Sequence, residues 1–408
     1  MTKILTKHFD EPKLHELETY RRLGGYEALK KALGMERKAL QEEVVKSNLR
    51  GLGGAGFPVG FKWSTVPPED KVPGPRYVVV NCDESEPGCF KDRVLVTRAP
   101  HQLLEGLLIA SYVIGAKDSF IFIRGEYQNQ YDILEKAVAE AKAAGLLGDV
   151  NLHLMRGAGA YISGLDTALL ETMEGKKAWP RQPPPFPTVA GLMGKPTVVN
   201  NVETLSMLPF IVREGGEAFA KIGSAKNGGT VLFSISGHVE KEGVYEVPMG
   251  TKLRDVLALA GGVKGGKKLK AVIPGGTSMP PLLEKDLDIA LDFDAIKAAG
   301  TMLGAGGMIV LDETVDAVEV AHNIERFLMH ESCGQCTPCR EGANWSERIL
   351  ERMLEGKGQA GDTENLARVG ENITGKVICA LGDTVGMVTR AWIGKFSDDF
   401  KKRVPNDG

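Results

Sequence analysis

Residues 331–342 read ESCGQCTPCREG and place Cys333, Cys336 and Cys339 at C-x2-C-x2-C spacing. Three soft thiolate ligands on one tight turn can hold three corners of an iron–sulfur cube. Cys379 lies downstream and can supply the fourth ligand. Zinc also accepts four cysteines, but its sites usually pair two C-x2-C units. The 3+1 pattern therefore predicts a [4Fe–4S] cluster, with zinc as the competing interpretation.

The chain has 408 residues and a formal net charge of −3, with acidic and basic residues mixed throughout. This length predicts two or three domains. The mixed charge gives no basic surface, so we expect no nucleic-acid partner. The N-terminus lacks a signal-peptide core, and the best apolar run, residues 103–116, is too short to cross a bilayer. We expect no direct membrane insertion.

Six cysteines are present, and four of them are assigned to the cluster. This usage indicates a reducing compartment rather than a disulfide framework. Cys82 and Cys89 are expected to be free structural thiols. The histidines are scattered without ligand spacing.

Residues 11–47 have apolar residues at helical spacing and predict a helix broken at Gly34. Residues 50–63 then read RGLGGAGFPVGFKW. The G-x-G-x-x-G in this stretch lacks the preceding strand of a Rossmann fingerprint. Bare backbone still lets a ligand approach closely, and its N–H groups can face a phosphate or a flat ring. We therefore expect a ligand-binding loop, with candidate residues Gly51, Gly53, Gly54, Ala55, Gly56, Phe57 and Lys62.

Residues 76–81 are rich in β-branched side chains and predict a buried strand. The strand delivers the acidic sequence NCDESEPG at its carboxyl end, where ligands bind in open α/β sheets. A solvated loop is the alternative, but a buried strand before a Pro-Gly turn favours hydrogen bonds to ribityl or ribose hydroxyls. The candidate residues are Asn81, Asp83, Glu84, Ser85 and Glu86.

Strand and helix patterns alternate over residues 100–155, which predicts a parallel sheet covered by helices. A second glycine loop, residues 156–169, opens a helix and contains Tyr161, Gly164 and Asp166. Ser163 and Asp166 have the spacing of a capping box, which is the structural interpretation of Asp166. Its functional alternative is a helix N-terminus that favours a negatively charged ligand.

Residues 183–187 read PPPFP and predict a rigid polyproline II segment that fixes Phe186. Residues 195–204 predict a strand that runs into a helix. Asn201 is suited to cap that helix. The side chains of this segment, Asn200 and Asn201 above all, are equally suited to bind a heterocycle edge.

Residues 231–236, 243–247 and 270–273 predict short strands, with a helix over residues 253–260. This small α+β unit suggests a ubiquitin-like domain with a structural role. From residue 317 onward the pattern is helical and carries the cysteine turn.

Together these stretches resemble the NADH-binding flavoprotein of respiratory complex I, that is, the family of NADH-quinone oxidoreductase F subunits. Diaphorase subunits of NAD-linked hydrogenases and formate dehydrogenases share its motifs. The resemblance covers about residues 26–396. It rests on the motifs at Gly51–Pro58, Asn81–Gly88, Gly157–Ile162, Pro184–Pro187, Gly194–Thr204 and Glu331–Arg340.

The resemblance implies an α/β fold with non-covalently bound FMN and a [4Fe–4S] cluster. It implies a helical segment over residues 1–47 and a Rossmann-like FMN/NADH domain over 48–225. A ubiquitin-like β-grasp domain over 226–312 and a helical cluster domain over 313–408 would follow. The activity implied is hydride transfer from NADH to FMN, followed by single-electron transfer to the cluster.

For individual residues, the resemblance implies that Glu86 holds the NADH ribose while Phe57 and Phe186 flank the adenine. Glu86 and Asp166 are the candidate catalytic residues. The residues expected to contact FMN or NADH also include Lys62, Asn81, Tyr161, Gly164, Asn200, Asn201 and Thr204.

The implied partners are a thioredoxin-like [2Fe–2S] subunit and a multi-cluster iron–sulfur subunit of the same complex. Quinone would be reached only through other subunits. The implied location is cytoplasmic, peripheral to the inner face of the cell membrane.

The sequence departs from the family pattern mainly on the nucleotide side. The departures are Leu52 for arginine, Leu165 and Asp166 for two glutamates, Pro183 for lysine, Ser163 for cysteine and Thr65 for an aromatic residue. Loss of one stacking ring costs on the order of 1 kcal/mol of nucleotide binding. We therefore predict weaker NADH binding than is usual in the family, or a different donor.

Two other functions compete with the complex I subunit. A diaphorase subunit often carries extra cysteine-rich domains, but no cysteine here lies outside the two motif regions. A scaffold that keeps the cluster and binds no nucleotide is the non-enzymatic alternative. Flavin content would separate the scaffold from the enzyme.

Overall fold

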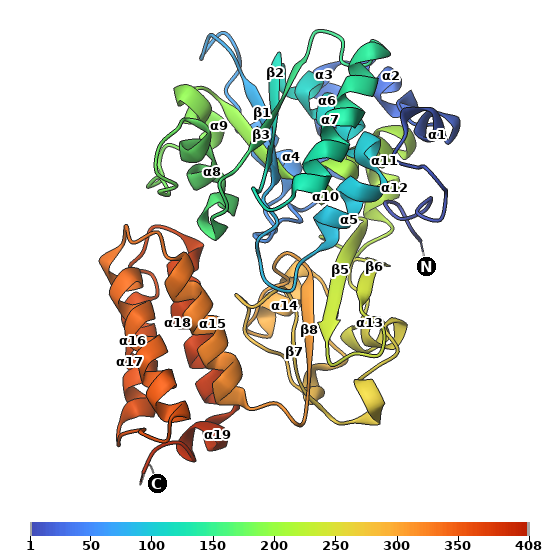
Figure 1. Cartoon of the computed structure of the whole chain (residues 1–408). Helices are drawn as coiled ribbons and strands as arrows, with labels where there is room; N and C mark the ends of the chain where they lie inside the picture. Colours follow the sequence, from blue (N-terminus) through green and yellow to red (C-terminus); the bar gives the residue numbers. More distant parts are fainter. Residues whose placement is uncertain (1, 406–408) are drawn as a thin grey trace.

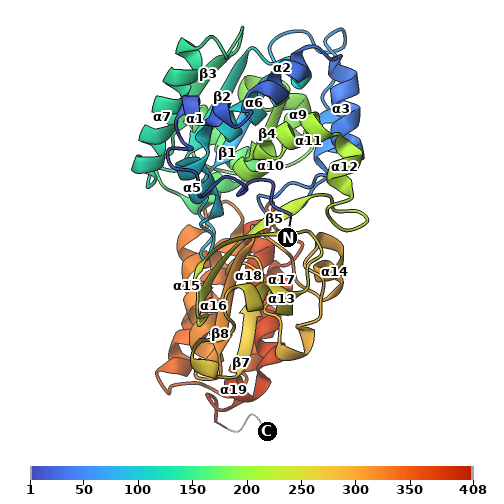
Figure 2. The same cartoon turned by 90° about the vertical axis from the view of Figure 1, so that its right-hand side faces the viewer.

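The computed structural model describes residues 2–405 and forms three packed units (Figure 1). An α/β unit occupies one end of the molecule. A second, smaller sheet and a helical bundle lie side by side at the other end, as the turned view in Figure 2 also shows.

The α/β unit is built on a parallel sheet in the order β3-β2-β1-β4, which confirms the parallel sheet expected from the sequence. Its central strand β1 contains Val78–Val80, which are fully buried. The chain moves to one side of β1 for β2 and β3 and to the other side for β4. This reversal creates a topological switch point between β1 and β4, where ligands bind in such sheets. The strands are β1 (Tyr77–Cys82), β2 (Asp118–Ile123), β3 (Asn151–Arg156) and β4 (Thr197–Asn201).

The helix α6 (Pro100–Ile114) forms the centre of this unit's core and packs against β1. It begins with Pro100 at its first turn and ends at Gly115, whose φ of 77° suits only glycine well. Nearly all of α6 is buried because helices surround it. The other helices of the unit are α4 (Val59–Ser64), α5 (Lys91–Arg98), α7 (Gln128–Ala143), α8 (Asp166–Met173), α9 (Pro187–Ala190), α10 (Val202–Ser206), α11 (Leu208–Glu214) and α12 (Gly216–Ala220).

The helix predicted over residues 11–47 is instead divided into three, and the first begins only at Leu17. The expected break at Gly34 is present. A second break lies at Gly24 and Tyr26, whose φ values of 92° and 66° are left-handed. The backbone N–H groups of residues 4–6 donate hydrogen bonds to the carboxylate of Glu246. The three helices are α1 (Leu17–Arg22), α2 (Glu27–Leu33) and α3 (Arg37–Lys46).

The second sheet has the order β6-β5-β8-β7 and is mixed, because β5 and β8 are parallel while both edge pairs are antiparallel. Three of its strands and its helix α13 (Leu253–Leu259) were predicted. The sequence analysis missed the central strand β8. The strands are β5 (Thr230–Gly237), β6 (Gly243–Pro248), β7 (Leu269–Ile273) and β8 (Gly307–Asp312), and α14 (Phe293–Ala298) precedes β8.

The C-terminal unit is the expected helical bundle. Its helices are amphipathic and bury Leu328, Leu350 and Trp392 among others in a shared core. Within residues 2–405, no helix combines the length and the apolar character that a bilayer-spanning helix needs. The helices are α15 (Ala317–Glu331), α16 (Thr337–Leu354), α17 (Asp362–Ile373), α18 (Ala380–Lys395) and α19 (Ser397–Lys401).

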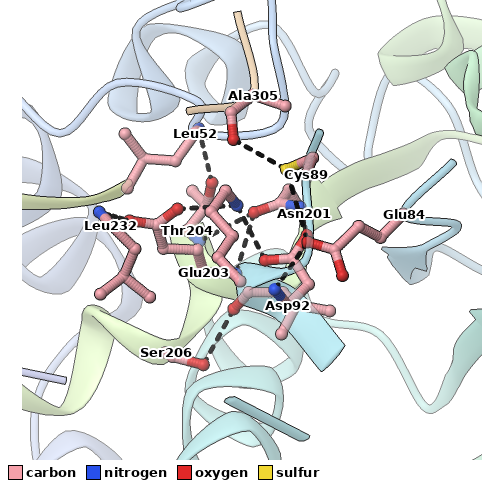
Figure 3. Close-up of polar contacts among 12 residues, drawn as sticks. Leu52, Glu84, Cys89, Asp92, Asn201, Glu203, Thr204, Ser206, Leu232 and Ala305 are labelled. Carbon is pink, nitrogen blue, oxygen red and sulfur yellow. Dashed lines mark hydrogen bonds and ion pairs between the residues drawn. The ribbon is translucent and has the colours of Figure 1, made fainter. Parts of the chain in front are cut away.

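A buried charge cluster joins the α/β unit to the second sheet. The ammonium of Lys91 is fully buried and lies 2.8 Å from Asp92 Oδ1 and 2.7 Å from Glu203 Oε2. Burial lowers the pKa of Lys91, but the attraction of the two carboxylates outweighs burial and holds it well above its usual value. Glu203 also accepts from the Leu232 N–H of β5 (Figure 3). The charged Lys91 and its carboxylate partners therefore connect the α/β unit to the second sheet.

Candidate functional site

The glycine loop lies at the switch point of the parallel sheet. It is closed at its base, where the Gly51 N–H donates to the Phe57 carbonyl over 2.9 Å. Gly53 packs so closely that a Cβ there would lie 2.8 Å from Asn201 Cβ. Gly54 has a φ of 139°, and a Cβ there would meet nothing within 4 Å. At Gly54 the loop thus presents bare backbone to open space, which suits a ligand cradle.

Lys62 on α4 brings a positive charge to this cradle. Its ammonium donates to the Val199 carbonyl at 2.6 Å and lies 2.9 Å from Asp166 Oδ2 at the start of α8. The next residue, Trp63, donates from its indole N–H to Asn200 Oδ1 at 2.9 Å. The structure therefore brings together the predicted residues Lys62, Asp166 and Asn200, which come from separate parts of the sequence.

The segment after β1 forms the opposite side of the cradle. Asn81 donates to the Gly164 carbonyl at 2.7 Å, and the Asp83 N–H donates to Asn81 Oδ1. A Cβ at Gly164 would lie 3.4 Å from Ser85 Oγ. The Oδ1 of Asp83 is buried with no hydrogen-bond partner among the described residues, and burial raises the pKa of Asp83 to about 7. An unpartnered carboxylate oxygen beside bare backbone fits a hydroxyl-bearing ligand such as FMN.

Other predicted contact residues use their side chains within the protein (Figure 3). The Glu84 carboxylate accepts from the N–H groups of Asp92 and Arg93 at the start of α5. Asn201 caps α10 with its oxygen, as expected, and donates to Asp92 Oδ2 at 2.6 Å. Thr204 Oγ1 accepts from the Leu52 N–H. These side chains shape the cradle, and their direct contact with a ligand stays a prediction.

Glu86 links the α/β unit to the loop after β7. Its carboxylate accepts from the Tyr161 hydroxyl at 2.6 Å, from the Ser278 N–H at 2.8 Å and from the Ser278 hydroxyl at 2.7 Å. Burial raises the pKa of Glu86. The sequence analysis missed Ser278, because nothing local marks a residue that lies far along the chain. A ribose held by Glu86 would have to replace one of these donors.

Three exposed phenylalanines lie on segments next to the cradle. Phe57, Phe61 and Phe186 are 49%, 59% and 61% exposed. The rings of Phe57 and Phe61 are 5.8 Å apart. Thr65, one helical turn after Phe61, shares a hydrogen bond of 2.8 Å with Thr188, close in sequence to Phe186.

The sequence analysis did not name Phe61, although it lies near Thr65, where an aromatic residue was judged to be absent, and one helical turn before it. The polyproline II prediction for residues 183–187 is wrong. The Pro183–Pro184 and Pro184–Pro185 bonds are both cis, whereas that helix requires trans bonds.

The four predicted cluster ligands, Cys333, Cys336, Cys339 and Cys379, line a single pocket. The pocket lies beside the α/β unit, because the indole N–H of Trp179 donates to the Cys333 carbonyl at 3.1 Å. Cys336 and Cys379 immediately precede α16 and α18, and helix N-termini favour thiolates.

Hydrogen bonds also reach these sulfurs. The backbone N–H of Ile378 donates to Cys336 Sγ at 3.4 Å. Ser332 Oγ lies 3.3 Å from Cys339 Sγ. Burial raises the pKa of Cys339 to about 11, so its thiolate form needs a bound cation. Within residues 2–405, no three His, Cys, Asp or Glu side chains converge as a single-ion site would require. The pocket, with its N–H donors and helix N-termini, fits an iron–sulfur cluster.

A short 3-10 turn, η1 (Tyr161–Gly164), lies between the cradle and the cysteine pocket. Ile162 lines the pocket, while Gly164 faces Asp83 and Ser85 in the cradle. The Tyr161 N–H donates to the carboxylate of Glu331, which lies just before the cysteine turn. The two candidate cofactor sites therefore share one wall.

The capping box predicted for Ser163 and Asp166 is wrong. Leu165 is the N-cap of α8 and makes no side-chain hydrogen bond there. Ser163 Oγ lies instead 3.5 Å from Thr172 Oγ1. Cys82 is buried, and both it and Cys89 are free thiols, as expected.

Comparison with known families divides the chain as the structure does. Residues 44–209 match the model of the Nuo51 FMN-binding domain, residues 232–282 match the SLBB domain, and residues 319–403 match the NADH-ubiquinone oxidoreductase-F iron-sulfur binding region. The chain thus carries an FMN-binding domain and a 4Fe-4S binding region.

Curated relatives match over almost the whole chain. The F 2 subunit of NADH-quinone oxidoreductase from Rhizobium meliloti is 48% identical, and the match covers 97% of this chain and 96% of the relative. The F subunit of NADH-quinone oxidoreductase from Mycobacterium tuberculosis is 45% identical, with coverage of 100% and 95%.

Among solved structures, an NAD+-reducing [NiFe]-hydrogenase in the H2-reduced state superposes with a TM-score of 0.88 at 33% identity. The match covers 99% of this chain and 67% of that one. The sequence motifs, the two cofactor sites and these relatives agree, and the chain belongs to the family of NADH-quinone oxidoreductase F subunits.

Proposed function

We propose that this chain is the electron-input subunit of an NADH:quinone oxidoreductase. It takes hydride from NADH and delivers single electrons to the cluster site. The observation that carries the proposal is the shared wall η1. Because Ile162 lines the cysteine pocket and Gly164 faces the cradle, one turn of backbone separates a flavin site from a cluster site. Adjacent sites of this kind suit electron transfer.

FMN would be held between the glycine loop and the ends of β1 and β4. Bound FMN supplies the conversion between a two-electron donor and a one-electron acceptor. Lys62 brings a cation beside it, balanced by Asp166, and so favours negative charge on the ligand. Asp83 offers its unpartnered oxygen to a ligand hydroxyl. The bare backbone at Gly54 allows close approach.

The NADH base would stack against the phenylalanines beside the cradle. Phe57, Phe61 and Phe186 leave large parts of their rings exposed, and flat bases stack on such rings. Phe61 lies one turn before Thr65, on the same face of the helix. Its ring can therefore replace in part the aromatic residue that the family has near Thr65. Leu165 and Pro183 still remove charged groups, so we keep the prediction of weaker NADH binding.

At the pocket, Cys333, Cys336, Cys339 and Cys379 would hold the [4Fe–4S] cluster, and the helix N-termini and N–H donors would stabilise its thiolates. Electrons would leave through partner subunits. We propose a thioredoxin-like [2Fe–2S] subunit and a multi-cluster iron–sulfur subunit. Quinone would be reached through them, at the inner face of the cell membrane.

A second candidate is a diaphorase subunit of an NAD-linked hydrogenase. The superposition on the NAD+-reducing [NiFe]-hydrogenase favours it, although the identity of 33% is lower than the 48% to the Rhizobium relative. Both functions use the same two sites. Purification of the chain with its native partners separates them, because only one assembly would transfer electrons from NADH to quinone.

The proposal is tested by loading the full chain with FMN, iron and sulfide and adding NADH without oxygen. We expect the flavin absorbance to bleach and an electron paramagnetic resonance signal of a reduced [4Fe–4S] cluster to appear. A protein that binds iron but no FMN would be the scaffold instead.

A further inference from the structure

The bundle that carries the cysteine pocket buries one carboxyl group for which the proposed function has no use. Glu325 of α15 is fully buried, and its Oε1 accepts from Thr389 Oγ1 of α18 at 2.6 Å. Its Oε2 has no partner among the described residues. Burial raises the pKa of Glu325 to about 8, and the Thr389 hydrogen bond opposes this rise only in part. An unpaired buried carboxyl is costly unless it holds a proton.

Two other unpartnered polar atoms lie in the same part of the bundle. Trp392 Nε1 is unpartnered, and Trp392 follows Thr389 by one helical turn. Ser346 Oγ of α16 is also unpartnered and fully buried. His322 of α15 lies 3.2 Å from Glu347 of α16, so these two residues are at the same height along the bundle. Ser346 directly precedes Glu347 and therefore lies within about one helical turn of Glu325 along the bundle axis.

The charged and titratable groups around Glu325 are few. On its own helix, His322 lies one turn before it, and on α16 the neighbouring acid is Glu347. From α18 it is faced by Thr389 and by the buried Trp392, neither of which carries a charge. No cation among the described residues contributes to its shift. The His322–Glu347 pair beside this layer is nearly buried, with side chains that are 16% and 12% exposed.

The position of Glu325 along the bundle relates it to the cluster pocket. Arg403 pairs with Asp316 at the far end of the bundle, so α15 and α18 run antiparallel and both meet the cysteines at the other end. Glu325 lies six residues before Glu331, the last residue of α15. At 1.5 Å per residue this is about 9 Å of helix, and the cysteine turn follows directly.

We propose that Glu325 is a proton-binding site coupled to the charge of the cluster. When one electron enters the cluster, the proton occupancy of Glu325 Oε2 rises by about half a proton, taken from solvent, and this proton returns to solvent when the electron leaves. No other bond forms or breaks, and the donor of the proposed electron path, or the chemical reductant of the test, supplies the electron. The inference rests on the proposed function only in requiring a reducible cluster.

The size of the coupling follows from the distance. A unit charge about 12 Å away, at an effective dielectric constant of about 20, changes proton affinity about tenfold. Starting from the pKa of about 8 that burial gives Glu325, half-protonation would therefore lie about one pH unit higher with the cluster reduced than with it oxidised. Linkage then requires the midpoint potential of the cluster to fall as the pH rises through this window. A tenfold coupling corresponds to about 59 mV for one electron.

The test is a redox titration of the full chain with its cluster and FMN bound, followed by electron paramagnetic resonance at several pH values. A chemical reductant sets the potential, so the result does not depend on NADH and remains separable from failure of the proposed function. The wild type should show a constant potential below about pH 7 and a fall of about 59 mV towards high pH. Glu325→Gln, which preserves shape, should show the same potential at all pH values.

Glu319→Gln, which removes an exposed carboxyl from the same helix, is the matched control and should keep the pH dependence of the wild type. Infrared difference spectra near pH 8.5 should show a protonated carboxyl signal that appears on reduction and is absent in Glu325→Gln. If Glu325→Gln retains the fall in potential, or the wild type shows none, the proposal is wrong. If Glu325→Gln fails to take up iron, Thr389→Val provides the second test. Loss of its hydrogen bond should shift the pH window upwards, and an unchanged window would contradict the proposal.

Discussion

The cysteine pocket and the glycine cradle are built in opposite ways. Three pocket ligands lie within one turn, and the fourth opens a neighbouring helix. The cradle combines segments that only the parallel sheet brings together: the glycine loop, the end of β1, the turn η1 and the end of β4. The pocket therefore depends on local spacing and the bundle, whereas the cradle depends on the fold of a whole unit. Substitutions should separate the two sites.

The largest effect is expected at the pocket. Cys339→Ser removes a buried ligand, and we expect complete loss of the cluster while FMN binding persists. Iron analysis and the visible spectrum measure both. Cys89→Ser is the control, since Cys89 lies outside the pocket and should keep full iron content. Loss of FMN together with the cluster would show that the sites are not independent.

The next largest effect is expected at the charge cluster beside the cradle. Lys91→Met leaves Asp92 and Glu203 buried without their cation and should destabilise the α/β unit by roughly 3–5 kcal/mol. Denaturant unfolding monitored by flavin release measures this change. The exposed pair of Lys46 with Glu43 provides the control, because solvent screens this pair and Lys46→Met should have a much smaller effect on stability. Equal effects of the two substitutions would contradict this account.

A pH effect on stability is expected in the bundle. The pKa of Glu325 in the folded state, about 8, lies above the ordinary value of a glutamic acid, so the folded bundle binds the proton more tightly than the unfolded chain. Its contribution to stability is complete below about pH 4 and is lost as the pH rises towards 8. Between pH 6 and pH 8.5 the bundle should lose on the order of 1–3 kcal/mol. Thermal unfolding should show a smaller loss in Glu325→Gln, and equal losses would contradict the pKa assignment.

The smallest effect is expected beside the cradle. Phe61→Leu removes one stacking surface from an exposed site, so folding should be unaffected. The KM for NADH should rise about tenfold with little change in kcat. Reduced nicotinamide mononucleotide, which lacks the adenine, should react equally well with both proteins. Trp345→Leu, an exposed aromatic residue in the bundle, is the control. An equal loss with both donors would place Phe61 outside the base site.

The sequence predicted most of the strands, and it named the four cysteines that line one pocket, because both follow local patterns. Val78, Val79 and Val80 are β-branched, and the cysteines have a recognisable spacing, so neither needs knowledge of distant residues. The strand β8 was missed, although it is central, since its pattern was not recognised between glycine-rich loops. The helix expected over residues 11–47 failed at Tyr26, whose left-handed φ no propensity indicates.

The candidate site was less predictable because the fold decides how each side chain is used. Glu84 and Glu86 lie two residues apart, yet Glu84 accepts hydrogen bonds at the start of α5 and Glu86 accepts them from Ser278 in the loop after β7. Neither partner can be read from a local motif. Lys62 and Asp166 were both named from the sequence, but their ion pair appears only when α4 and α8 meet.

The most direct test mixes the loaded full chain with NADH in an anaerobic stopped-flow instrument and follows flavin and cluster absorbance separately. The account predicts rapid bleaching of the flavin followed by reduction of the cluster. In Cys339→Ser only the first phase should remain. Flavin that NADH does not bleach, or a pocket that holds zinc instead of the cluster, would contradict the account.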